Sequence, residues 1–173
     1  MGRGEYLEID GRPAIRFERT YPHPIERVWA AISEPDQLHH WFPSTVAIEG
    51  RAGGAIEFSG DPYMTDTRGT VLQYDPPRRL AFTWGGDELH FELDPDGDGG
   101  CRLVMTNVLE RRDTASRNGS GWSVCLAVLE RHLDGETVGG PHAPDAVAPP
   151  AESYEDYVAA GVPSGAPFPD ATT

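Results

Sequence analysis

Two neighbouring histidines, His39 and His40, are the residues in this sequence whose types most readily suggest chemistry. Imidazoles can hold a metal ion or transfer a proton. On a helix, however, paired histidine ligands usually stand four residues apart, whereas adjacent side chains leave the axis about 100° apart. The other four histidines are scattered, with no Cys-x-x-Cys or His-Glu-x-x-His pattern near them. We therefore expect no metal ion, and we expect His39 and His40 to point toward solvent.

Two further stretches look like functional motifs but are explained without a catalytic role, and a third motif is excluded. The stretch DPDGDGG at 94–100 looks like a calcium loop but lacks the glutamate that closes an EF-hand, so it is typical of a turn. NGSGW at 118–122 lacks the five-residue Gly-x-Ser-x-Gly pattern of serine hydrolases. Ser120 is better explained as part of a helix N-cap region, with Asn118 or Ser116 as alternatives. A P-loop is excluded because the chain has no lysine.

The composition limits the partners. The chain of 173 residues has 28 acidic and 14 basic residues, all of the latter arginine, and a net charge of -14. Such a chain has no electrostatic reason to bind nucleic acid or an anionic membrane surface. No segment approaches the roughly 20 apolar residues of a membrane span, and the N-terminus has no hydrophobic run, so we expect a cytoplasmic protein with no membrane insertion. Cys101 and Cys125 are too few for a disulfide framework and are expected to be buried thiols.

The periodicity of apolar residues predicts the elements. Residues 12–21 alternate in the manner of a strand with one buried face. Residues 25–32 carry apolar side chains at i, i+3, i+4 and i+7 between Pro24 and Pro35, which predicts a short amphipathic helix. A second short helix should follow and end at Pro43, with Leu38, Trp41 and Phe42 on its inner face.

The rest of the chain predicts an α+β domain. Residues 44–109 read as six short strands joined by turns, which makes seven strands with the first and implies an antiparallel sheet. Residues 115–135 form a long helix with a wide apolar face, which must pack on that sheet. We expect an N-terminal extension over 1–13, one domain over 14–135, and a Pro/Ala-rich acidic tail over 136–173 that is flexible apart from a short docking helix at 152–160.

Four motifs in order resemble one family. They are HPIERVWAAISEPDQLHHWFP, RAGGAIEF, GTVLQYDPPRRLAFTW and GWSVCLAVLERHLDG. The resemblance covers residues 14–135 in order, and we expect it to include the segment from Tyr154 to Gly161. They are similar to the START-like, helix-grip superfamily, and within it to the group related to the C-terminal domain of the activator of Hsp90 ATPase. The resemblance implies a curved antiparallel sheet of about six or seven strands wrapped around the C-terminal helix, with an apolar cavity between them.

Such a cavity would be lined by the inward-facing residues of the strands and helices. The alternation of apolar residues places large side chains on this face, as in many small-molecule pockets. We expect Trp41 and Phe42 near its entrance. The predicted ligand-binding residues are Trp41, Phe42, Phe58, Phe82, Trp84, Phe91, Met105, Asn107, Trp122, Leu126 and Leu129. A tightly filled interior is the alternative.

Two positions depart from the resemblance. Asn107 and Ser123 stand where many members of the group have histidine, which weakens any proposal of imidazole acid–base chemistry. Buried Asn107 could bond a ligand or, more simply, a group of the protein itself. We therefore expect a non-catalytic binding protein for a hydrophobic or aromatic small molecule, with no cofactor, as a monomer or weak dimer. The alternatives are a cyclase- or hydrolase-type enzyme for a polyketide-like substrate, with Asn107, Ser123 and Tyr63 as polar candidates, and an interaction module for an Hsp90-type chaperone.

Overall fold

A single antiparallel sheet of eight strands is the main element of the protein. The computed structural model describes residues 2–171. The sheet order is β1-β2-β8-β7-β6-β5-β4-β3. The strands are β1 (Glu5–Ile9), β2 (Arg12–Tyr21), β3 (Thr45–Ile48), β4 (Ala55–Ser59), β5 (Thr67–Asp75), β6 (Arg79–Trp84), β7 (Asp87–Asp96) and β8 (Gly100–Val108). The helices are α1 (Ile25–Ser33), α2 (Pro35–Leu38), the 3-10 turn η1 (Arg112–Thr114), α3 (Ala115–Leu133) and α4 (Tyr154–Ala159).

The α+β class, the curved antiparallel sheet and the long C-terminal helix are confirmed, but the expected strand number of six or seven was wrong. The additional strand is β1, which lies in the presumed N-terminal extension and pairs with β2 from Glu5 opposite Arg16 to Ile9 opposite Arg12. Asp10 and Gly11 join the two strands with φ values of 51° and 78°. Two consecutive left-handed residues make the tight turn that matches the twist of a hairpin, and Asp-Gly is a preferred pair for it.

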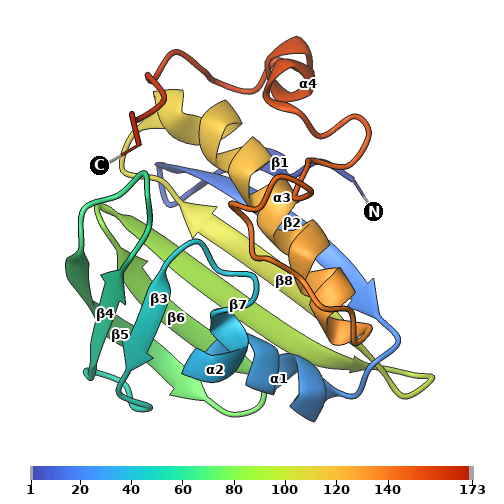
Figure 1. Ribbon diagram of the computed structural model, residues 1–173. Coiled ribbons are helices and arrows are strands. Elements are labelled where there is room, and N and C mark those ends of the chain that lie inside the picture. The colour runs from blue at the N-terminus through green and yellow to red at the C-terminus, as the bar shows by residue number, and fades with distance from the viewer. Residues whose placement is uncertain (1, 172–173) are drawn as a thin grey trace.

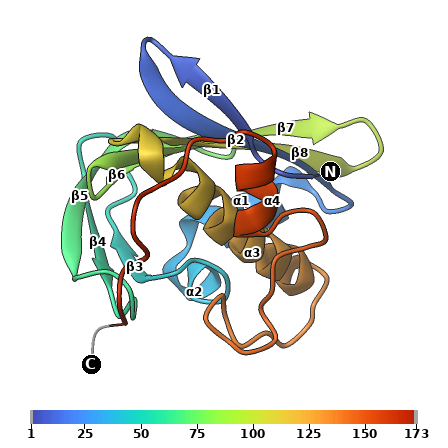
Figure 2. The ribbon, with the colours of Figure 1, turned by 90° about the horizontal axis from the view of Figure 1, so that it is seen from above.

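The sheet curves around α3 (Figure 1), and the view from above shows β1 rising away from the helix layer (Figure 2). A register shift between Val71 and Gln73 on β5 contributes to the bend, because an extra residue on one strand increases local twist. Gly69 allows β5 to lie close to Thr83, since a Cβ at this position would stand 2.5 Å from the Thr83 carbonyl oxygen.

Helix α3 packs against the sheet on one side and against α4 on another. Trp122, Leu126 and Leu129 are buried in the core beneath the sheet. Gly119 allows a close approach, because a Cβ there would lie 2.7 Å from both the Ile15 side chain of β2 and the Tyr157 ring of α4. The helix starts at Ala115, earlier than a cap at residue 120 would allow. Ser120 lies inside the helix and its hydroxyl donates to the carbonyl of Arg117.

The C-terminal segment returns along α3, as the red ribbon shows in Figures 1 and 2. Ser153 caps α4 by accepting a hydrogen bond from the Asp156 N–H, and the Asp156 side chain accepts in return from the Ser153 N–H. Tyr157 is fully buried, and its hydroxyl accepts from the Gly4 N–H at 2.8 Å. A buried ion pair of 3.3 Å also links Glu152 to Arg19 on β2.

Candidate functional site

A cluster of aromatic rings fills the space between the sheet and α3, with Phe42 at its centre. The Phe42 ring centroid lies 6.0 Å from Phe58, 6.2 Å from Phe82, 6.3 Å from Trp84 and 5.6 Å from Trp122. These separations are within the range of favourable ring–ring contact. The second short helix was expected to end at Pro43, but α2 ends at Leu38. A turn follows in which the Phe42 N–H donates to the Leu38 carbonyl at 2.8 Å, and it places Phe42 against the rings that alternate inward on β4 and β6.

The remaining predicted lining residues extend this cluster into the core. The Phe91 ring lies 6.0 Å from Phe82 and 6.3 Å from Trp41. Trp41 is completely enclosed, and its indole N–H donates to the carbonyl of Ala31 at 2.8 Å. Of the aromatic pair expected at an entrance, only Phe42 lines a surface groove. Met105, Leu126 and Leu129 are buried in the same core.

Trp84 is the half-buried member of the cluster. Its ring lies 5.2 Å from that of Trp122. The Trp84 indole N–H is shielded from solvent and has no hydrogen-bond partner among the described residues. A buried donor without an acceptor costs about 1–3 kcal/mol, so this N–H is a ready donor for any acceptor placed beside it.

A polar network lies next to the rings, at the ends of β7 and β8. Asn107 Oδ1 accepts from the Trp122 indole N–H and from Asn118 Nδ2, both at 3.1 Å. The Asn107 amide in turn donates to Asp87 Oδ2 at 3.0 Å, and Asn118 Nδ2 also reaches this oxygen. The other Asp87 oxygen accepts from the Glu110 N–H at 2.9 Å. Burial raises the pKa of the Asp87 carboxyl, although the Glu110 and Asn107 bonds oppose that rise.

The network fixes the start of α3 against two strands. Asn107 was predicted to face inward, and it is fully buried with side-chain partners rather than mainly backbone ones. Sequence reasoning missed Asp87 and Asn118. Counting by twos back from Phe91 and Leu89 reaches Asp87 on the inner face, so a signal was present. Asn118 stands one helical turn before Trp122, where both can reach one acceptor.

The three polar candidates for catalysis have different surroundings. The Ser123 hydroxyl bonds that of Tyr157 at 2.8 Å and so faces the C-terminal segment. Tyr63 is 49% exposed, with its ring 5.6 Å from that of His142. Asn107 bonds the Asp87 network. The structure therefore does not bring Asn107, Ser123 and Tyr63 together.

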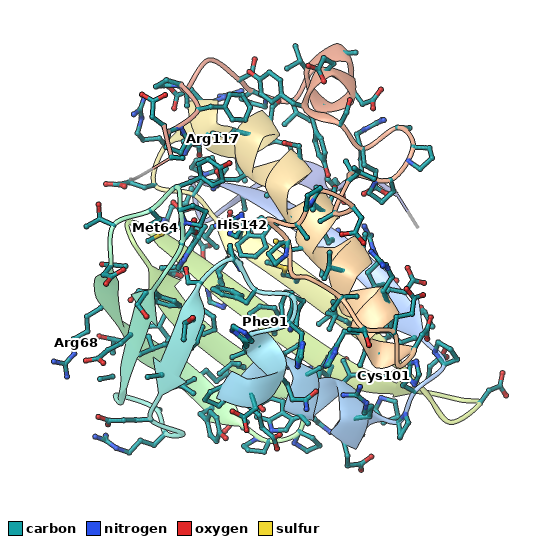
Figure 3. The ribbon with its side chains drawn as sticks, viewed as in Figure 1. Met64, Arg68, Phe91, Cys101, Arg117 and His142 are labelled. Carbon is teal, nitrogen blue, oxygen red and sulfur yellow. The ribbon has the colours of Figure 1, made fainter. Side chains whose placement is uncertain are left out.

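The two cysteine thiols, from β8 and α3, are free and buried. Burial raises the pKa of Cys101 to about 11 and that of Cys125 further. Thiolate is the nucleophilic form, so neither side chain is poised for nucleophilic chemistry. Cys101 lies at the opposite end of the sheet from Arg117 and Met64 (Figure 3).

His39 and His40 were expected to point toward solvent, and this was wrong for His40. His39 is exposed, but His40 is half-buried and stacks on His132 of α3, with ring centroids 4.4 Å apart and planes at 16°. Burial lowers the pKa of His132, and the nearby His40 and Arg27 lower it further. Over residues 2–171 no group of three His, Cys, Asp or Glu side chains is placed to hold a metal ion.

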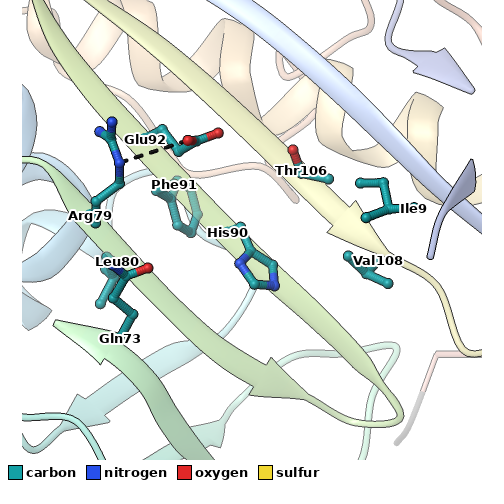
Figure 4. A pocket seen from close by; sticks show the side chains of 9 residues that line it. All are labelled: Ile9, Gln73, Arg79, Leu80, His90, Phe91, Glu92, Thr106 and Val108. Atoms are coloured by element: carbon teal, nitrogen blue, oxygen red, sulfur yellow. Dashed lines mark ion pairs between the residues drawn. The ribbon is translucent and has the colours of Figure 1, made fainter. Parts of the chain in front are cut away.

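Two shallow hollows lie at the surface, and one of them reaches the ring cluster at Phe42. One, of about 310 Å³, runs beside Phe42 between residues 42–45 and residues 138–142. The other, of about 290 Å³, lies on the outer face of the sheet, where Ile9, His90, Thr106 and Val108 surround it (Figure 4). At its edge Arg79 and Glu92 form an ion pair of 3.7 Å. In the part of the chain that the structure describes, no helix is long and apolar enough to cross a membrane.

Comparison with known proteins decides the family. The family model described as Activator of Hsp90 ATPase homolog 1-like protein matches residues 22–134, which include β3 to α3. The chain belongs to this family. The helix-grip architecture described above is therefore that of the START-like superfamily, as the four motifs predicted. No curated protein matches the chain.

Solved structures of similar proteins carry the same fold as this Activator of Hsp90 ATPase homolog 1-like domain. The solution structure of CalU16 from Micromonospora echinospora is 25% identical, with a TM-score of 0.67 over 90% of this chain and 89% of that one. The protein encoded by BPP1335 of Bordetella parapertussis is 32% identical, with a TM-score of 0.63 over 80% and 82% of the two chains. EF2215 from Enterococcus faecalis, a conserved protein of unknown function, reaches a TM-score of 0.70 at 20% identity over 91% and 89%.

Proposed function

We propose that this domain binds a planar aromatic or apolar small molecule against the ring cluster, at the edge formed by Trp84 and Trp122. The shielded, unpaired indole N–H of Trp84 is the observation that supports this proposal most directly. The ligand would offer an acceptor, such as a ketone oxygen, to this N–H. Its rings would pack on Trp84 and Trp122, because stacked and edge-to-face aromatic contacts are favourable beyond the area they bury.

The polar network supports this proposal by holding Trp122. The Trp122 N–H is bonded to Asn107, and Asn107 is held by Asp87, so the second ring has a fixed orientation. A preorganised ring loses less freedom on binding than a mobile one. Trp84 lacks such a partner and is half-buried. It is therefore the ring that can adjust to an entering molecule while the rest of the cluster stays closed.

The function that follows is sequestration or presentation of the ligand rather than its conversion. Asn107, Ser123 and Tyr63 do not share a site, and Asn107 has its hydrogen-bonding groups occupied within the protein. The family's name refers to activation of an Hsp90 ATPase. We favour ligand binding for this chain because the unpaired Trp84 N–H, a buried group that needs a partner, lies at the ring cluster.

Titration of the full chain with flavone, a planar aromatic ketone, tests this function. We expect quenching of tryptophan fluorescence and saturable binding that Trp84→Phe weakens by about fivefold, since the variant keeps a ring but loses one hydrogen bond. Trp29→Phe is the matched control, because Trp29 is a partly buried tryptophan of α1 whose ring contacts that of Tyr74. Absence of saturable binding, or equal weakening by both variants, would contradict the proposal.

A further inference from the structure

The groove beside Phe42 is built from two segments that are far apart in the sequence. Residues 42–45, between α2 and β3, form one wall, and residues 138–142 of the C-terminal segment form the other. His142 joins the walls, because its Nε2–H donates to the carbonyl of Pro43 at 2.9 Å. Figure 3 shows His142 between α3 and the β3 side of the sheet. The two walls are therefore held at a fixed separation.

Ser44 supplies an unsatisfied hydrogen-bonding group in this groove. The residue is only 4% exposed and it lines the groove, yet its hydroxyl has no partner among the described residues. Buried hydroxyls in folded proteins are nearly always hydrogen-bonded, so an unpaired one requires an explanation. A hydroxyl can both donate and accept, and a bound molecule with its own hydroxyl could satisfy either role.

The surroundings of Ser44 favour a flat, neutral partner. The Phe42 ring and the Pro43, Val138 and Pro141 side chains provide apolar surface, and Gly139 and Gly140 leave the opposite wall without side chains. Besides Ser44, its polar lining residues are Thr45 and three histidines, His39, His40 and His142, and none of the described lining residues is acidic or an arginine. Asp61 lies just outside, 3.7 Å from His142 Nε2, and the chain carries a net charge of -14, so an anionic ligand would be disfavoured.

The volume of the groove limits the size of the partner. An enclosed apolar cavity of about 150 Å³ binds a single benzene ring. The groove measures about 310 Å³, roughly twice that volume, which is room for two fused rings. We propose that this groove is a second ligand site, specific for a neutral one- or two-ring aromatic molecule with a hydroxyl group. Its rings lie against Phe42 and its hydroxyl exchanges a hydrogen bond with Ser44.

The second site is separate from the one at Trp84, so the two proposals can fail independently. Phe42 is shared, but the groove touches Ser44, Gly139 and Gly140, whereas the other site touches Trp84 and Trp122. The backbone amide resonances of Ser44, Gly139 and Gly140 report binding in the groove. The indole resonances of Trp84 and Trp122 report binding at the other site. Both sets can be followed in one titration with a simple aromatic probe.

The experiment is an NMR titration of the ¹⁵N-labelled full chain with 2-naphthol and, in parallel, with naphthalene. We expect 2-naphthol to shift the Ser44, Gly139 and Gly140 amides and to bind about fivefold more tightly than naphthalene, which lacks the hydroxyl. Ser44→Ala should remove that difference. Ser59→Ala, on the exposed surface of neighbouring β4, is the control and should preserve it.

Four results would overturn the proposal. Three of them are equal affinity for naphthalene and 2-naphthol in the unmodified chain, retention of the difference in Ser44→Ala, and shifts confined to the Trp84 and Trp122 indoles. The first comparison uses only the unmodified protein, so it decides the matter even if Ser44→Ala does not fold. Absence of any shift on addition of 2-naphthol would equally contradict a site in the groove.

Discussion

The indole N–H of Trp122 donates to Oδ1 of Asn107 at 3.1 Å, and this bond joins α3 to β8 inside the core. The same oxygen also accepts from Asn118, so one amide orients both the ring and the first turns of the helix. A buried acceptor with two donors is difficult to replace, because any apolar substitute leaves the Trp122 N–H unpaired and removes one of the two acceptors of Asn118.

Asn107→Leu tests the importance of this amide for stability. The change leaves the Trp122 N–H without its acceptor, takes one of two acceptors from Asn118 and one donor from Asp87, so we expect the free energy of unfolding to fall by about 3 kcal/mol. Urea denaturation measures this. Arg102→Gln on the same strand is the control, since its pair with Glu18 is exposed to solvent and should contribute little to stability. A similar loss for both variants would show that the network has no special role.

The pH dependence of Asp87 has a definite sign. Its folded-state pKa is raised by burial above the unfolded value of 3.8. Below that value this group's contribution to stability is fully present, and it is lost as pH rises through the folded-state pKa, because the unfolded chain releases the proton first. Asp87→Asn cannot titrate, so the unfolding free energy of the wild type minus that of the variant should decrease as pH rises. A difference that increases with pH would contradict the burial of this carboxyl.

The contribution of His132 to stability should depend on pH in the opposite sense to that of Asp87, and in a higher pH range. Burial, followed by the nearby His40 and Arg27 charges, lowers its folded-state pKa below 6.5. Its contribution to stability is present above 6.5 and is lost as pH falls through the lowered pKa. His40→Gln removes one of the opposing charges and the stack of 4.4 Å. Between pH 7.5 and 5.5, we expect the melting temperature of this variant to fall less than that of the wild type. His39→Gln, at the exposed neighbouring position, is the matched control.

Trp41→Ala should be among the more damaging single changes. The ring is completely buried against Phe91, and its N–H satisfies the Ala31 carbonyl. Removing a large buried aromatic costs about 3–5 kcal/mol through lost contacts and the cavity left behind. Thermal denaturation should show this, with His39→Gln as a nearby surface control. A loss below about 1 kcal/mol would mean that the core collapses into the space.

Removal of the Tyr157 hydroxyl tests how the C-terminal segment is attached. Tyr157→Phe keeps the ring but leaves the buried Gly4 N–H and the Ser123 hydroxyl without this partner. We expect a loss of about 1–3 kcal/mol and faster hydrogen exchange at Gly4. Tyr154→Phe on the same helix is the control. Unchanged exchange at Gly4 would argue that the segment is held mainly by its other contacts.

Local sequence patterns predicted the elements and the inward-facing rings well, because alternation and helical spacing depend only on near neighbours. Phe58, Phe82 and Phe91 alternate inward as expected, and Phe42 meets two of them. Strand β1 was missed although Asp10-Gly11 is a hairpin signal, since the short segment before it has mixed character.

Contacts between distant segments were not predictable in the same way. The pairing of Asp87 with Asn118 requires β7 and α3 to meet at one end, and the bond from His142 to Pro43 depends on the path of a proline-rich tail. No local period encodes these contacts. The groove and its unpaired Ser44 hydroxyl therefore emerged only from the three-dimensional arrangement.

The central claim, that a planar aromatic ligand binds at Trp84, is tested most directly by the Trp84 indole N–H resonance during titration with flavone. We expect this resonance to move downfield and saturate, because the N–H gains an acceptor that it lacks in the free protein. The Trp29 indole resonance should stay in place. A Trp84 resonance that does not move while flavone binds, or that moves no more than that of Trp29, would contradict the proposed site.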